Sequence, residues 1–240
     1  MKVYFLSDFH LKFQENEEDR TRRERVLSFL RSLIGKADIL ILNGDIFDLW
    51  FDWNSVIIKG YFPLLKVLAD LDENGCRLIL ITGNHDFWFN NFLPDYLNME
   101  IYSDYFEEII DNVKVHVTHG DRHTSNDLRY KLFRAIIRNR FVKFLFQIIH
   151  PDLALKLGRL LSRSSRERKI PPTLKKKKEQ GLIRSADKIL KHCDLVVMGH
   201  SHSPLLEKRR KGTYVNLGDW ITSNSYLEMT DGKFHLKINN

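Results

Sequence analysis

Five short polar motifs, each directly after a run of aliphatic and β-branched residues, constrain this chain more than any other feature. Such runs are typical of buried strands. In chain order the motifs are Asp8-Phe9-His10, Gly44-Asp45, Gly83-Asn84-His85-Asp86, His119-Gly120-Asp121 and Gly199-His200-Ser201-His202. Sites in parallel α/β sheets lie beyond the carboxyl ends of the strands. We therefore expect the five motifs to meet at one edge of a sheet.

The motifs contain side chains that suit metal ions. Imidazole, carboxylate and amide groups, without a thiolate, suit divalent cations such as Mn²⁺, Fe²⁺ or Zn²⁺. The set is too large for one ion and fits two ions that share a bridging carboxylate, for which Asp45 has two oxygens. Two ions about 3.5–4 Å apart would activate water and neutralise charge during displacement at phosphorus. The sequence predicts a two-metal hydrolase with the ligands Asp8, His10, Asp45, Asn84, His119, His200 and His202.

The first third of the chain alternates strand and helix. Strands are predicted at 2–7, 38–43, 77–82 and, further on, 113–118 and 194–198, with helices near 18–34 and 63–74. This rhythm indicates an α/β fold with a largely parallel sheet and helices outside it. The carboxyl-terminal segments TYVNLGDW, SYLEMT and FHLKI alternate in the manner of an antiparallel meander.

Residues 127–190 read as helix only. We predict a core of residues 1–126 and 173–240, and an inserted basic amphipathic helical cap at 127–172, broken by Pro151. Between Arg129 and Lys178 there are sixteen basic and two acidic residues, so this stretch carries +14 while the rest of the chain carries −7. Basicity concentrated in this way indicates an anionic partner at one face, such as a membrane surface or a phosphate ligand.

The remaining composition narrows the class of protein. Cys76 and Cys193 are too few for a disulfide framework and predict reduced core thiols in a cytosolic protein. No apolar run approaches the roughly 20 residues that a transmembrane helix requires. The amino-terminal segment MKVYFLSDFH leads into a strand, and we interpret it as structural sequence rather than a signal peptide.

The motif series DxH, GD, GNHD, HG and GHxH, from residue 8 to residue 202, resembles the calcineurin-like metallophosphoesterases. The resemblance implies a four-layer α/β/β/α sandwich with a dinuclear centre. It implies one ion at Asp8, His10, Asp45 and His202, and another at Asp45, Asn84, His119 and His200. It also implies that His85, oriented by Asp86, contacts the scissile phosphate or protonates the leaving group.

A narrower resemblance lies outside those motifs. The segment HGDRHTSNDLRYKLFRAIIRNR, the basic insert with RSSRERK, and VNLGDW are similar to the UDP-2,3-diacylglucosamine diphosphatases of lipid A biosynthesis. This similarity implies two ions, taken as Mn²⁺, and hydrolysis of a lipid-linked UDP-sugar at the inner face of the cytoplasmic membrane. That family is expected to carry Arg where this chain has His85. The positions that match its sugar and phosphate contacts are Asp127, Ser164, Ser165, Arg166 and Lys169.

Other functions remain open at this point. One is a phosphodiesterase or nucleotide phosphatase of the same superfamily with a soluble substrate. Another is a nuclease, since the cap is basic, although its aliphatic rows suit lipid better than bases and it offers few aromatic side chains for stacking. A non-catalytic scaffold is a further alternative, and the complete ligand set argues against it. The sequence does not indicate an oligomeric state.

Overall fold

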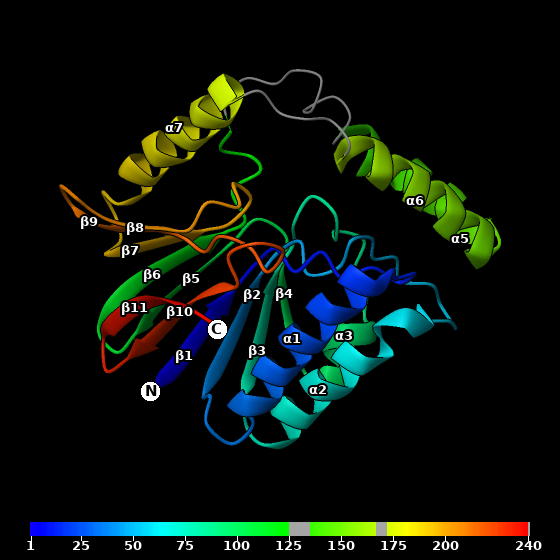
Figure 1. Cartoon of the computed structure of the whole chain (residues 1–240), viewed down its shortest axis with the longest axis horizontal. Coiled ribbons are helices and arrows are strands. Elements are labelled where there is room, and N and C mark those ends of the chain that lie inside the picture. The colour runs from blue at the N-terminus through cyan, green and yellow to red at the C-terminus, as the bar shows by residue number, and fades with distance from the viewer. Residues whose placement is uncertain (125–134, 167–171, 240) are drawn as a thin grey trace.

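Two β-sheets face each other and carry helices on their outer faces in the computed structural model (Figure 1). The structure describes residues 1–124, 135–166 and 172–239, without the side chains of residues 159–166, 172 and 174. The layers follow the order helix, sheet, sheet, helix. The predicted four-layer α/β/β/α sandwich is therefore confirmed.

The first sheet has the strand order β11-β10-β1-β2-β3-β4. Strands β1 to β4 run parallel to one another, and β10 pairs antiparallel with β1. The strands are β1 (Lys2–Leu6), β2 (Ile39–Asn43), β3 (Arg77–Ile81), β4 (Glu100–Tyr102), β10 (Ser225–Thr230) and β11 (Lys233–Ile238).

The second sheet has the order β5-β6-β7-β9-β8, with a parallel centre of β6, β7 and β9 between antiparallel edges. Its strands are β5 (Tyr105–Ile110), β6 (Val113–Thr118), β7 (Leu195–Met198), β8 (Leu205–Arg209) and β9 (Gly212–Asn216). The predicted carboxyl-terminal meander is confirmed for SYLEMT and FHLKI, which form the antiparallel β10–β11 hairpin of the first sheet. It is wrong for TYVNLGDW, because β9 belongs to the second sheet. Alternating hydrophobicity identifies a strand but not its partner.

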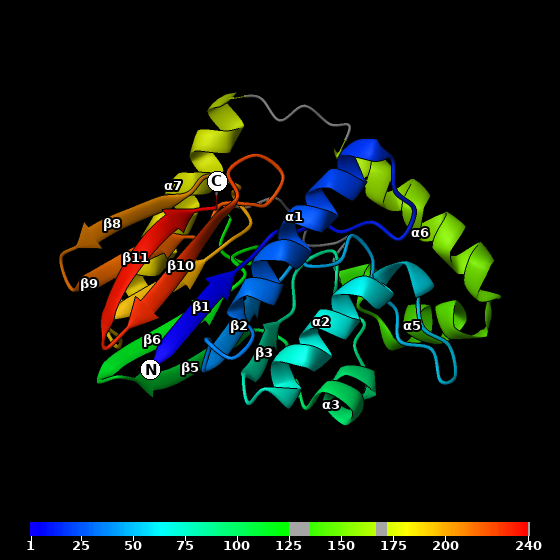
Figure 2. The ribbon, with the colours of Figure 1, turned by 60° about the horizontal axis from the view of Figure 1, so that its bottom comes forward.

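Helices α1 (Glu17–Leu33), α2 (Phe62–Glu73) and α3 (Phe92–Leu97) lie along the first sheet, as Figure 2 shows, and a short helix η1 (Lys59–Tyr61) precedes α2. Helix α1 begins with a capping box, in which the Asn16 side chain accepts from the Asp19 amide and the Asp19 carboxylate accepts from the Asn16 amide. On the far side, α7 (Pro172–Ile189) covers the second sheet.

Three apolar layers hold these elements together. Between the sheets lie alternate residues of the central strands, among them Phe5, Ile41 and Val197. Between the first sheet and its helices lies a second cluster that includes Leu30 and Leu68. The third lies under α7 and is made by Leu182, Ala186, Leu190, Cys193, Val196, Met198 and Tyr214. Strands β1, β2, β3 and β7 are thus covered on both faces, which explains their hydrophobic runs.

Two further helices, α5 (Arg140–Ile148) and α6 (Pro151–Arg166), lie beside the first sheet's helices and fall in the predicted cap (Figure 1). Asn139 begins α5 by accepting a hydrogen bond from the Phe141 amide, so the segment up to residue 149 is not the single helix expected from its periodicity. Phe146 packs against Phe51 and Trp88 of the core. None of the helices in the described ranges is long and apolar enough to cross a membrane.

Candidate metal centre

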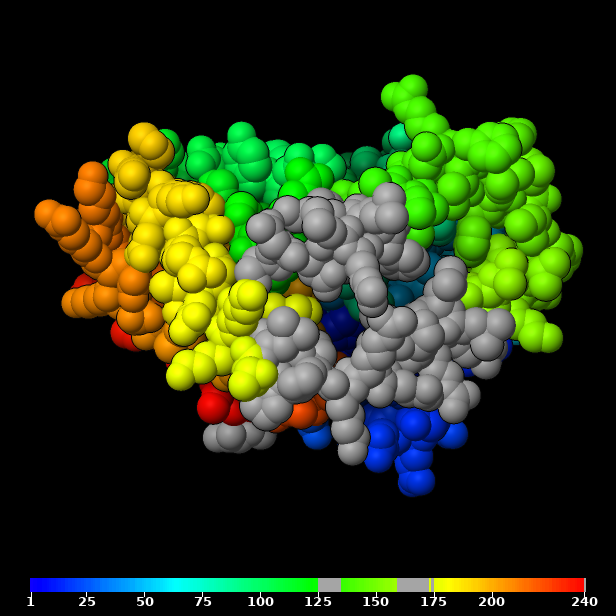
Figure 3. Space-filling view, turned by 90° about the horizontal axis from the view of Figure 1, so that it is seen from above, coloured from blue at the N-terminus to red at the C-terminus, as the bar shows by residue number. Residues whose placement is uncertain are grey.

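Backbone hydrogen bonds bring the five motifs together at the carboxyl ends of β1, β2, β3, β6 and β7. The Asp8 amide donates to the Gly44 carbonyl (3.1 Å), and the Gly199 amide donates to the His119 carbonyl (3.0 Å). The two sheets are joined by the Asn43 side chain, which donates to the Thr118 carbonyl (3.0 Å). Figure 3 looks onto this end of the molecule, with α7 in yellow on one side and α5 and α6 in green on the other.

Asp8, His10 and His202 form one cluster. The Nε2 atom of His202 lies 3.1 Å from Oδ1 of Asp8 and 3.3 Å from Nε2 of His10. The His10 nitrogen is also 3.6 Å from that carboxylate oxygen. Two imidazole nitrogens and a carboxylate oxygen therefore converge on one small space, an arrangement that a bound cation would stabilise.

Asp45, His119 and His200 form a second cluster, with Asn84 at its edge. The His119 Nε2 atom lies 3.3 Å from Oδ2 of Asp45 and 3.3 Å from Oδ1 of Asn84. Its other ring nitrogen is 2.8 Å from the Asn43 carbonyl, which fixes the ring from behind.

Asp45 lies between the two clusters. Its Oδ2 atom is 3.3 Å from His119 and 3.7 Å from His10. Its Oδ1 atom instead accepts the backbone amides of Asn84 (2.8 Å) and His85 (2.9 Å). Asp45 is thus placed where it could contact an ion in either cluster, while its Oδ1 atom is held by backbone amides.

The backbone at the motifs is strained. Five of the seven predicted ligands have φ in the left-handed region, namely Asp8, His10, Asp45, His200 and His202, with values between 46° and 66°. Non-glycine residues rarely adopt this region, and such residues cluster at functional sites. At Gly83, a Cβ atom would collide with the Asp45 carboxylate, so this position requires glycine for close approach.

Electrostatics at the clusters favour bound cations. Burial alone would raise the pKa of Asp8, but the imidazoles of His202 and His10 hold it well below its usual range. Burial would likewise lower the pKa of His202, yet the carboxylates of Asp8 and Asp219 raise it to about 10. Positive charge at this position therefore stabilises the buried carboxylates. The donor set of imidazoles, carboxylates and one amide fits two divalent ions.

The structure corrects the predicted orientation of His85. The Asp86 carboxylate does not contact His85; it accepts the amides of Asp45, Ile46, Phe47 and Gly83 at 2.7–3.1 Å. The ring of His85 turns to Asp48, with Nδ1 3.2 Å from the Asp48 carbonyl and 3.6 Å from its Oδ1. Asp86 is fully buried beneath four amide donors, and these outcompete an imidazole for its oxygens.

Sequence reasoning missed three residues at this site. Asp48 follows Asp45 by three positions, and this spacing does not indicate a contact with His85 unless the conformation of the loop is known. Asp219, in the VNLGDW segment, lies 3.2 Å from Nδ1 of His202. Arg138, from the cap, donates to the Gly83 carbonyl (2.9 Å) and lies over the Phe87 ring at 4.9 Å.

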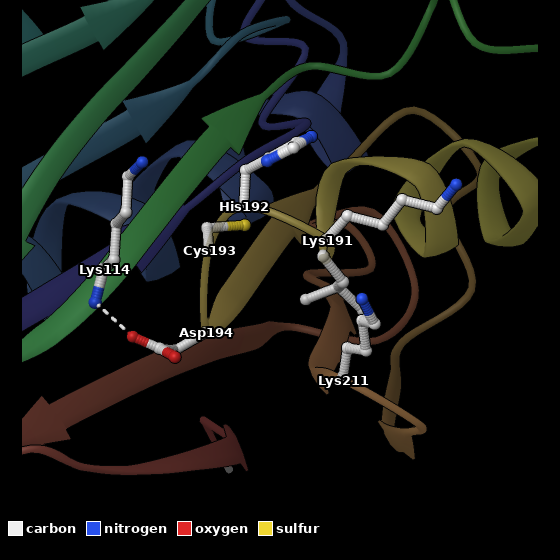
Figure 4. Close-up of a pocket in the computed structure, with 7 residues that line it drawn as sticks. Lys114, Lys191, His192, Cys193, Asp194 and Lys211 are labelled. Atoms are coloured by element: carbon white, nitrogen blue, oxygen red, sulfur yellow. Dashed lines mark hydrogen bonds between the residues drawn. The ribbon is translucent and has the colours of Figure 1, made fainter.

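The predicted substrate contacts lie outside this description. Asp127 and Lys169 are not among the described residues, and the side chains of Ser164, Ser165 and Arg166 are not described. A hollow occurs at the amino-terminal ends of β6, β7 and β9 (Figure 4). It is lined by Lys114, Leu190, Lys191, His192, Cys193, Asp194 and Lys211.

Comparison with known proteins agrees with this geometry. The calcineurin-like phosphoesterase family matches residues 1–204. A UDP-2,3-diacylglucosamine hydrolase of Porphyromonas gingivalis is 28% identical over 94% of this chain and 92% of its own length. One of Haemophilus ducreyi is 25% identical over 97% of both chains. A solved archaeal phosphodiesterase superposes with a TM-score of 0.52 at 15% identity, covering 100% of both chains, and supports the fold alone.

Proposed function

We propose a substrate for this chain, which belongs to the calcineurin-like phosphoesterase family and is a metal-dependent hydrolase. It hydrolyses the pyrophosphate of UDP-2,3-diacylglucosamine to UMP and 2,3-diacylglucosamine 1-phosphate, a step of lipid A biosynthesis. The observation that carries this proposal is the similarity to UDP-2,3-diacylglucosamine hydrolases, which extends over nearly the whole chain, cap included. The match to the calcineurin-like phosphoesterase family covers residues 1–204 and does not by itself select a substrate.

In this proposal one divalent ion is held by Asp8, His10, Asp45 and His202, and the other by Asp45, Asn84, His119 and His200. The two clusters and the shared position of Asp45 support the assignment. When bound, such ions activate water and withdraw charge from a phosphoryl oxygen. We take the ions as Mn²⁺, which suits the mixed imidazole and oxygen donors.

His85 has a separate role in this proposal. Its Nδ1 atom faces Asp48, and its ring lies edge-on to His10, with centroids 4.9 Å apart. Nε2 is then the nitrogen that can donate a hydrogen bond to the phosphate or a proton to the leaving group. Asp86 acts at one remove, by holding the backbone of the loops that carry Asp45 and Asn84.

The cap supplies the lipid-facing side of the proposal. Its described helices leave seven large apolar side chains exposed, namely Ile136, Phe141, Phe144, Leu145, Ile148, Leu153 and Leu157. Exposed apolar groups beside basic residues suit acyl chains and the surface of an anionic membrane. We therefore propose that the enzyme works at the cytoplasmic face of that membrane. Asp127, Ser164, Ser165, Arg166 and Lys169 remain our proposal for the contacts to sugar and phosphates.

The cap's basic residues divide into two groups that a membrane experiment must separate. Arg138 and Lys143 bond to the core, at Gly83 and Asn90, so changing them disturbs how the cap sits on the metal loops. Arg140 and Lys156 are exposed and serve as the membrane-facing test. Phe141→Ser together with Phe144→Ser should weaken binding to anionic vesicles. Tyr96→Ser, which removes an aromatic ring 74% exposed on α3, is the control and should not.

The substrate is tested by UMP release from UDP-2,3-diacylglucosamine with Mn²⁺, alongside the same UDP-sugar without acyl chains. We expect turnover of the acylated substrate and little of the other. Turnover of neither, with hydrolysis of a generic phosphodiester, would reject the substrate and retain the phosphoesterase. Cleavage of single-stranded DNA with a steep dependence on salt would indicate a nuclease instead.

A further inference from the structure

Asp219 and His202 lie side by side although they are separated in sequence. His202 follows β7 and Asp219 follows β9, and these two strands pair in parallel, so their carboxyl ends meet. The Nδ1 atom of His202 is 3.2 Å from Oδ2 of Asp219. The other ring nitrogen of His202 faces Asp8 and His10.

The carboxylate of Asp219 is held in place by the loop that follows it. Its Oδ1 atom accepts the amides of Thr222 and Ser223, each at 2.9 Å, and the Thr222 hydroxyl at 3.0 Å. Asp219 is 2% exposed. With Oδ1 occupied by these donors, Oδ2 is directed toward the imidazole.

The His202 ring is more exposed than those of two other predicted ligands, His10 and His119, so it depends more on a partner that fixes its orientation. Its side chain is 34% exposed, against 4% for His10 and 1% for His119. The His10 and His119 rings are therefore enclosed more completely than the His202 ring, which contacts Asp8, His10 and Asp219. In the described part of the chain, Nδ1 of His10 has no hydrogen-bond partner, and Nδ1 of His119 faces a neutral carbonyl.

We infer that Asp219 is a positioning residue that makes His202 a competent metal ligand. It accepts the Nδ1 proton, which leaves the lone pair of Nε2 directed at Asp8 and His10, and its charge makes the imidazole a stronger donor to a cation. The inference rests on the metal assignment of the proposed function but not on the identity of the substrate.

A purely structural role for Asp219, as the cap of the loop at residues 219–223, must be separated from this one. Asp219→Asn keeps an oxygen for the loop amides and removes the charge that faces His202. Thr222→Val is the matched control, because it removes a hydroxyl that bonds Asp219 and leaves the His202 contact intact. The melting temperature of each metal-free variant reports how far the loop has been weakened.

The experiment is calorimetric titration of the metal-free chain with Mn²⁺, which requires no substrate. Asp219→Asn should weaken one of two binding events by about 10–100-fold, the usual effect of losing a carboxylate partner of a metal-bound histidine. The other event and both events in Thr222→Val should stay as in the wild type. Unchanged affinities in Asp219→Asn, or an equal loss in Thr222→Val, would overturn the inference.

The same titration distinguishes the two levels of the account. If the wild type binds two ions and Asp219→Asn weakens one, the inference stands even when UDP-2,3-diacylglucosamine is not cleaved, and only the substrate is wrong. If the wild type binds fewer than two ions, the metal assignment fails and the inference fails with it.

Discussion

The Asp86 carboxylate accepts a hydrogen bond of 2.9 Å from the backbone amide of Asp45, the residue that lies between the two metal clusters. The same carboxylate binds the Gly83 amide at 2.9 Å, next to Asn84. One buried side chain thus fixes two ligand-bearing loops that come from different strands.

Replacing Asp86 with Ala should therefore affect stability first. Four buried amides lose their acceptor, and an unsatisfied buried donor costs about 1–3 kcal/mol. We expect the free energy of unfolding of the metal-free chain to fall by about 3 kcal/mol or more, measured by urea denaturation. A variant that keeps its stability but loses activity would instead support a direct role of Asp86 at His85.

Replacing Asp48 with Asn should show the opposite pattern. The His85 ring loses a charged neighbour at 3.6 Å, while the loop amides bound by Asp86 are untouched. We expect kcat to fall about tenfold, less than the roughly 10²–10⁴-fold contribution of a positioned acid or base itself, with little change in melting temperature. Equal effects on kcat in a His85→Ala, Asp48→Asn double variant and in His85→Ala alone would show that Asp48 acts through His85.

Replacing Asp45 with Asn should abolish hydrolysis without unfolding the chain. The amide retains an oxygen for the Asn84 and His85 amides, but the charge between His10 and His119 is lost. We expect metal affinity to fall by more than about 100-fold, beyond the effect of changing a group that only supports a ligand. An unchanged rate of hydrolysis would reject the two-metal mechanism.

Replacing Arg138 with Ala should weaken catalysis from the cap side. A hydrogen bond from a charged group contributes about 1.5–3 kcal/mol, so kcat/KM should fall by about tenfold or more. Arg138→Lys should restore little, since Lys lacks the planar group that stacks on Phe87. The control is Arg31→Ala, an exposed arginine on α1 outside the cap, and the prediction fails if it lowers kcat/KM by the same factor.

Asp19 should make stability depend on pH. Burial alone would raise its pKa, but hydrogen bonds from Lys12 and the Asn16 amide lower it below the usual 3.8. A carboxylate with a depressed pKa stabilises the fold above its unfolded pKa, and this contribution is lost as the pH falls through the folded value. Asp19→Ala should cost about 1 kcal/mol at neutral pH, as for loss of a helix cap. The difference from wild type should disappear in acid; a constant difference would contradict the assignment.

Much of the fold follows from local sequence. Continuous aliphatic runs such as residues 39–43 predict strands buried on both faces. The ligand motifs follow these runs and come together because the carboxyl ends of the parallel strands of both sheets lie at the same end of the molecule. The sheets that β9 and β10 join could not be predicted, because the alternation of hydrophobic and polar residues is the same whichever sheet a strand joins. The three-residue strand β4, strand β5 and the six-residue helix α3 carry too little periodicity to be predicted.

The metal ligands were predictable because their chemistry is unusual at strand ends. Their supporting residues were not. Asp48 and Asp219 are ordinary aspartates in sequence, and their roles come from loops folding toward His85 and His202. The family resemblance pointed instead to Asp86, the neighbour of His85. Backbone amides hold that carboxylate, a preference that only the packed loops reveal.

The most direct test of the account is hydrolytic activity measured against the number of Mn²⁺ ions bound per chain, as metal is added to the metal-free protein. The account predicts that UDP-2,3-diacylglucosamine hydrolysis rises with the second ion and is complete at two ions per chain. Full activity with a single ion bound would contradict the central claim, because Asp45 would then have no second ion to bridge.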